Sequence, residues 1–218
     1  MADSDIKLES ASIVFLGSFN PKIFHPVWFA SENMVSKQEA ESAEISFIHP
    51  ELSSFSMSKI QYEITRDRFV IQTAYTPSFA VMKDLVLGTF GLLHYTPVHS
   101  MGLNHEFHFL LDSEETWHRF GHKVAPKEIW TDILEKPGTR KLIVEGVRTD
   151  QRKGYVRIEI APSVQVHPGV FIAVNDHFQV AEPESNAGCQ EMLGVLIKEW
   201  DLFLDSSKQS ALRLLERK

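Results

Sequence analysis

Six of the ten histidines in this 218-residue chain lie between His94 and His122. Histidine is the commonest metal ligand, and its ordinary pKa of about 6.5 lets it change charge near neutral pH. This segment is therefore the first place to look for a metal site or for acid–base chemistry.

One pair of histidines in the segment has the spacing of metal ligands. His118 and His122 are four residues apart, which places both side chains on one face of a helix. Asp112, Glu114 or His108 could supply a third ligand. The pair predicts a divalent-metal site and, as one alternative function, a metal-dependent hydrolase.

Other histidines indicate structural roles or a small-ligand pocket. His105 and His108 are three residues apart in an alternating strand, so we expect them on opposite faces, and the HExxH spacing is absent. His177 lies in the sequence VNDHF (174–178), where the asparagine and the aspartate favour a turn after a strand. A pocket between sheet and helix that holds His105 or His177 is a third functional alternative.

No complete catalytic signature accompanies these residues. The sequence has no GxSxG nucleophile elbow and no GxxxxGK[ST] or GxGxxG phosphate loop. Its lone cysteine, Cys189, excludes an internal disulfide and a multi-cysteine metal site. We therefore expect a non-enzymatic protein with no catalytic residues, and no cofactor except the divalent metal of the hydrolase alternative.

A cluster of aromatic residues offers a different chemistry, that of a protein-binding surface. Phe24, His25, Trp28 and Phe29 lie close together in the sequence, and Pro26 with His25 interrupts any regular core pattern. Aromatic side chains are enriched at protein–protein interfaces. The cluster predicts an exposed anchor for another protein or for a second copy of the chain.

The expected elements indicate an α+β fold with antiparallel sheets. Alternation predicts strands over 12–19, 44–48, 97–111, 140–149, 155–160, 169–174 and 178–180, and a hairpin over 59–74. The serine-rich sequence at 53–58 looks like a polar connection. Two long apolar helices, over 79–93 and from Met192 onward, are expected to pack the sheets.

We expect one continuous α+β domain over residues 12–218, preceded by a flexible tail at 1–11. A hairpin followed by an apolar helix, and then a meander followed by an amphipathic helix, predict two loosely similar halves at about 12–135 and 136–218. The start of the chain lacks a signal-peptide pattern, and no apolar stretch reaches about 18 residues. A cytoplasmic location without membrane contact is expected.

The charge of the chain argues against nucleic-acid binding. Twenty-nine acidic residues outnumber 22 basic ones, which gives a formal net charge of −7. A protein of this kind repels phosphate backbones unless its basic residues gather on one face. The densest basic stretch, residues 140–157, is interrupted by Glu145 and Asp150, so we expect solvated strand edges and a turn there.

The middle third of the chain carries a pattern of an apolar helix, a strand with a Gly-Leu step and a polar end. The pattern comprises Leu85–Leu93, then Thr96–Val98, then Met101–Asn104. In these residues the chain resembles a sporadically distributed family of uncharacterised bacterial proteins. The family's usual arginine before the step and its aromatic-Asn after the step are replaced, by Ser100-Met101 and by Asn104-His105. The resemblance implies an accessory role, such as a subunit of a bacterial defence assembly.

Overall fold

The computed structural model describes residues 5–182 and 187–216. Its strands are β1 (Asp5–Gly17), β2 (Glu44–His49), β3 (Leu52–Met57), β4 (Ile60–Thr65), β5 (Arg68–Thr73), β6 (Val98–Leu110), β7 (Leu142–Val147), β8 (Gly154–Pro162) and β9 (Gly169–Gln179). Its α-helices are α1 (Pro26–Ser31), α2 (Lys37–Glu41), α3 (Phe79–Leu92), α4 (Glu114–Val124) and α5 (Gly188–Glu216). Three short 3-10 helices are η1 (Pro21–Ile23), η2 (Thr76–Ser78) and η3 (Glu128–Trp130). The expected α+β class is confirmed.

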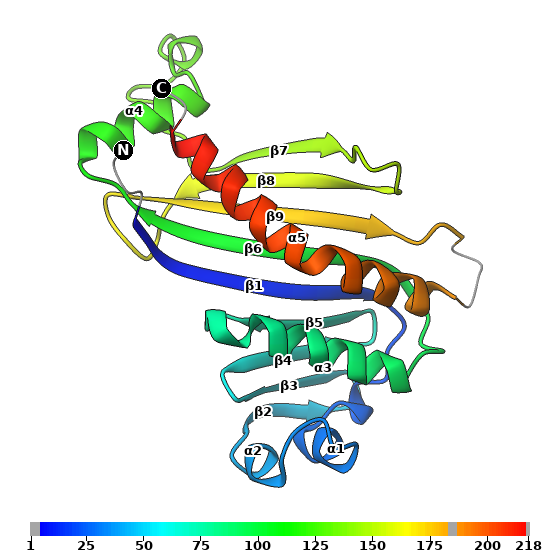
Figure 1. Cartoon of the computed structure of the whole chain (residues 1–218). Helices are drawn as coiled ribbons and strands as arrows, with labels where there is room; N and C mark the ends of the chain where they lie inside the picture. Colours follow the sequence, from blue (N-terminus) through cyan, green and yellow to red (C-terminus); the bar gives the residue numbers. More distant parts are fainter. Residues whose placement is uncertain (1–4, 183–186, 217–218) are drawn as a thin grey trace.

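All nine strands of the described ranges belong to one sheet (Figure 1). Their order is β2-β3-β4-β5-β1-β6-β9-β8-β7, and each neighbouring pair is antiparallel. The two longest strands, β1 and β6, are paired in the middle of the sheet. The edges are β2 at one end and β7 at the other.

Helices α3 and α5 lie on the same face of the sheet (Figure 1). α5 packs on β6 and β9, while α3 packs on β5 and also contacts α5. Both helices place large apolar residues against the sheet, among them Phe90 from α3 and Trp200 from α5, each fully buried. The face of β6 that they cover carries the alternating residues Met101, Leu103, His105, Phe107 and Phe109. Burial of these apolar side chains holds the helices on the sheet.

Capping residues begin the two short helices α1 and α2. Pro26 occupies the first turn of α1, and His25 caps that helix by accepting a hydrogen bond from the Trp28 backbone N–H. Ser36 and Glu39 form a capping box at the start of α2. The hairpin expected over 59–74 is confirmed as β4 and β5.

Three local expectations are wrong. Residues 5–11, expected in a flexible tail, belong to β1, because the backbone of a polar segment pairs with β6 as well as an apolar one does; residues 1–4 lie outside the described part. The serine-rich sequence forms β3, in which Phe55 and Met57 point into the core. The sequence VNDHF is no turn, since β9 continues through it.

Candidate functional site

The histidines of segment 94–122 are dispersed over several elements. His105 and His108 lie in β6 on opposite faces, as expected, with His105 buried and His108 half-buried. His118 and His122 lie on α4, where their spacing places them on one side of the helix. The cluster in the sequence is therefore not a cluster in space.

The expected metal pair lacks a third ligand within the described residues. The His122 Nε2 atom lies 2.9 Å from the Glu128 Oε1 atom, and His118 contacts the Trp117 ring. Within residues 5–182 and 187–216, no group of three or more His, Cys, Asp or Glu side chains is placed to hold a metal ion. The divalent-metal site and the hydrolase built on it thus gain no support from the geometry.

The aromatic cluster expected as a partner anchor is mostly core. Phe24 and Phe29 are 1% and 0% exposed, and their rings pack on neighbouring aromatic residues of the sheet and of α3. His25 serves as the cap of α1, and Trp28 is half-buried against both phenylalanines. The expectation of an exposed anchor is wrong for Phe24 and Phe29, because β3 and the β4–β5 hairpin bury them.

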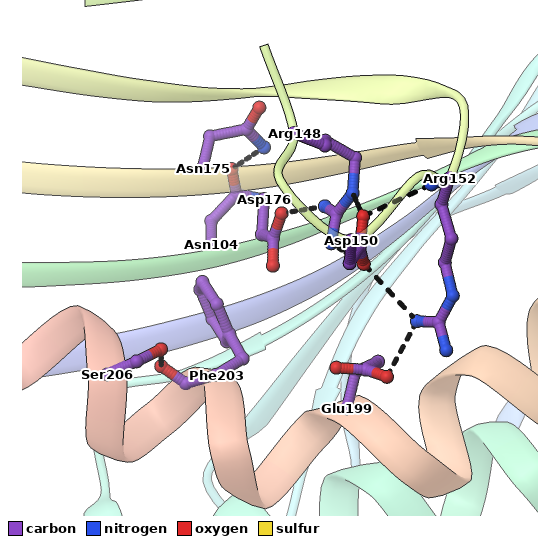
Figure 2. A network of polar contacts seen from close by, with 9 residues as sticks. All are labelled: Asn104, Arg148, Asp150, Arg152, Asn175, Asp176, Glu199, Phe203 and Ser206. Carbon is purple, nitrogen blue, oxygen red and sulfur yellow. Dashed lines mark hydrogen bonds and ion pairs between the residues drawn. The ribbon is translucent and has the colours of Figure 1, made fainter. Parts of the chain in front are cut away.

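A polar network lies where the β7–β8 turn meets α5 (Figure 2). Arg148 binds Asp150 through two hydrogen bonds, of 2.7 Å and 3.0 Å, and also donates to Asp176 of β9. Its guanidinium carbon lies 3.8 Å from the centre of the Phe178 ring. The Arg148 side chain is only 6% exposed, so the network is enclosed. Sequence reasoning missed it because a turn was expected at Asp176.

A further ion pair extends this network to α5. The Arg152 Nη1 atom lies 2.6 Å from the Glu199 Oε1 atom of that helix. Burial raises the pKa of the Asp176 carboxyl above its ordinary value, although the Arg148 guanidinium acts to lower it. The network therefore links the β7–β8 turn to β9 and α5. Burial of the Asp176 carboxylate opposes this stabilisation.

A buried histidine links three distant parts of the chain. The His105 Nδ1 atom lies 2.7 Å from the Ser207 Oγ atom, and its Nε2 atom lies 2.9 Å from the Glu9 Oε1 atom. The residue types are those of a serine-hydrolase triad. However, Ser207 is 2% exposed and donates its hydroxyl hydrogen to the Leu204 carbonyl. A substrate has no access to this hydroxyl, so the arrangement joins α5 to β1 and β6.

The Glu9 carboxylate contributes stability that depends on pH. The hydrogen bond from His105 is the main cause that lowers the pKa of Glu9 below its ordinary value, Lys208 at 3.1 Å lowers it further, and burial opposes both. A carboxyl whose pKa is lower in the folded state stabilises the fold above its unfolded pKa, and this contribution is lost as the pH falls through the folded pKa.

We therefore expect Glu9→Gln to lower the free energy of unfolding by about 1–3 kcal/mol at neutral pH. The difference from the wild type should shrink as the pH falls below about 4.5. Urea denaturation at a series of pH values measures both quantities. A difference that stayed constant down to pH 3 would contradict the assignment to the Glu9 charge.

The face of the sheet opposite α3 and α5 carries a polar hollow of about 380 Å³. Tyr155 and His177 stack there with ring centres 4.5 Å apart, and Arg157 lies over Tyr155. Burial, followed by the Arg157 charge, lowers the pKa of His177. The Asn175 amide donates to Asn104 at 2.7 Å, so several polar groups of this hollow already bind one another. Of the two histidines of the small-ligand alternative, His177 lines this hollow and His105 is enclosed in the core.

The two edge strands, β2 and β7, both expose apolar side chains to solvent. In β7, Ile143, Val144 and Val147 are 49%, 57% and 88% exposed. Pairing with β8 is regular along all six residues, while the pairing of β2 with β3 shifts register between Ile45 and Phe47. The outer backbone groups of a regular edge strand can accept a further strand.

No protein-family model and no curated protein matches this chain. In the described residues, no helix has both the length and the apolar character that crossing a membrane requires.

Proposed function

We propose that the protein is a non-enzymatic protein-interaction module that pairs through β7 with a second copy of itself. The observation that carries the proposal is the regular, unpaired outer edge of β7 with its exposed Ile143, Val144 and Val147. Exposed edges normally carry bulges, prolines or inward charges that prevent pairing. β7 has no register shift and no proline, whereas β2 has a register shift.

Charge complementarity favours a second copy as the occupant. In an antiparallel pair centred on Ile143, Lys141 of each copy faces Glu145 of the other, and Leu142 faces Val144. Within each chain Lys141 already lies 2.7 Å from Glu159, and Glu145 lies 2.8 Å from Arg157. The two-fold symmetry makes the interface self-complementary and closed.

Two substitutions at the centre of this register give a specific test. Ile143→Lys and Ile143→Glu each place like charges opposite one another in a homodimer, so each variant alone should be monomeric. A mixture of the two should form a heterodimer, because lysine then faces glutamate. Light scattering and native mass spectrometry at about 100 µM protein report both states, since a six-residue edge pairing is expected to have micromolar affinity.

Val164→Lys is the matched control, because Val164 is 89% exposed and lies outside the strands. It should dimerise like the wild type. A monomeric wild type at this concentration, or variants that dimerise alone as well as mixed, would overturn the proposal.

We infer an accessory subunit of a bacterial, defence-related assembly in the cytoplasm, in line with the resemblance described above. The basic residues of 140–157 support a protein partner over nucleic acid, since Arg148, Arg152 and Arg157 are each paired with a carboxylate. The two loosely similar halves, with two long apolar helices packing the sheet, stay a prediction.

A further inference from the structure

A cavity of about 320 Å³ lies between α4, residues 136–139 and the end of β8. Its walls are mainly apolar and include Trp117, Phe120, Val124, Ile160, Pro162 and Val170. The Trp117 indole N–H donates to the Gly169 carbonyl at 2.9 Å, which fixes the ring as one wall. Small-molecule sites have volumes of about 300–1,000 Å³ and mostly apolar walls. The cavity has the size and the character of a site for one small apolar ligand.

The charges around this cavity have one sign. Lys127, Lys136 and His118 line it, and no aspartate or glutamate does. Neither lysine forms an ion pair with a carboxylate of the described residues, and the neighbouring Glu128 binds His122 instead. Two lysines that line an apolar cavity without counterions attract an anionic group.

We propose that this cavity binds an unbranched aliphatic monocarboxylate of medium chain length. The apolar chain fills the space against Phe120 and Val124, and the carboxylate lies between Lys127 and Lys136. The small volume favours a single chain of about ten carbons or fewer over a two-chain lipid. No residue of β7 lines this cavity, and ligand binding and dimerisation are measured separately, so the two proposals can fail independently.

A series of ligands tests the chemistry. Hexanoate, octanoate and decanoate are titrated against the whole protein, by calorimetry and by tryptophan fluorescence. Affinity should rise about fourfold for each methylene that enters the cavity. Decanol should bind more weakly than decanoate, and decylamine more weakly still. Equal affinities for decanoate and decylamine, or no binding of any of these ligands at millimolar concentration, would overturn the proposal.

Removal of the two charges tests the position of the carboxylate. The double variant Lys127→Met, Lys136→Met should lose about tenfold or more of its decanoate affinity and keep its decanol affinity. Lys123→Met is the matched control, because Lys123 lies on α4 but does not line the cavity. A double variant that binds decanoate like the control contradicts the proposed position.

Filling of the cavity tests the position of the chain. Gly121 of α4 lines the cavity, and a Cβ atom added there meets nothing within 4 Å. Gly121→Leu should abolish decanoate binding while the melting temperature stays equal or rises, because leucine has a higher helix propensity than glycine. Gly194→Leu on α5, where an added Cβ is equally free, is the control and should bind normally. Retained binding in Gly121→Leu would refute the site.

Discussion

Replacing Arg148 with methionine is expected to lower the free energy of unfolding by about 3–5 kcal/mol. The Arg148 and Asp176 side chains are 6% and 16% exposed, so the variant leaves a carboxylate enclosed without its counterion. It also removes the guanidinium from the Phe178 ring. Denaturation by urea, followed by circular dichroism, measures the loss.

A second substitution separates charge from packing. In the double variant Arg148→Met, Asp176→Leu the charge and its partner are both absent, and most of the lost stability should return. Arg157→Met is the surface control, because its ion pair with Glu145 is about half exposed, and it should cost about 1 kcal/mol or less. An equal loss in the double and single variants would mean that Arg148 acts through packing alone.

The pH dependence of the single variant provides a further check. Asp176 has a pKa above its ordinary value, and loss of Arg148 raises that pKa more. A carboxyl whose pKa is raised in the folded state stabilises the fold fully below its unfolded pKa. This contribution is lost as the pH rises through the folded pKa. The deficit of Arg148→Met should therefore be largest at neutral pH and smaller near pH 4.

Phe24→Ala is expected to cost about 3–5 kcal/mol of unfolding free energy. The Phe24 ring packs on Phe69 and Phe90 with centre distances of 5.5 Å and 6.3 Å, and its backbone carbonyl accepts a hydrogen bond from Ser53. Truncation of the Phe24 side chain leaves a cavity between β5, α3 and the segment that precedes α1. The measurement is again urea denaturation.

Val27→Ala supplies the control for this prediction, because Val27 lies in the same segment and is 67% exposed. It should change the free energy of unfolding by about 0.5 kcal/mol or less. If Phe24→Ala were as stable as Val27→Ala and instead lost dimerisation, the segment would be a partner surface after all.

Much of the fold could be predicted from local patterns. The alternation of Ile60, Tyr62 and Ile64 indicates β4, and the apolar run after Ser78 indicates α3. These signals suffice because each depends only on which side of one element is buried. The Phe24 segment misled the prediction because short helices with proline and histidine lack a clear period.

The polar networks could not be predicted, because their members are far apart in the sequence. Glu9, His105 and Ser207 come from β1, β6 and α5, and none of them belongs to a local motif. Asn175 and Asp176 predict a turn, because their side chains can bind local backbone groups. Only the tertiary structure shows that Asp176 lies in β9 and accepts a hydrogen bond from Arg148 of the β7–β8 turn. Exposure of the β7 edge likewise follows from strand order alone.

The central position of β1 constrains how the chain folds during synthesis. Ala11 faces both Thr73 of β5 and His105 of β6, so the pairing of β1 is complete only after both later strands have been synthesised. The buried side of β6 packs mainly on α5, which follows every strand of the sheet in the sequence. Non-local pairing of this kind slows folding. Phe107 and Phe109 are therefore expected to stay exposed on the nascent chain until α5 has been synthesised, so chaperones are expected to bind it.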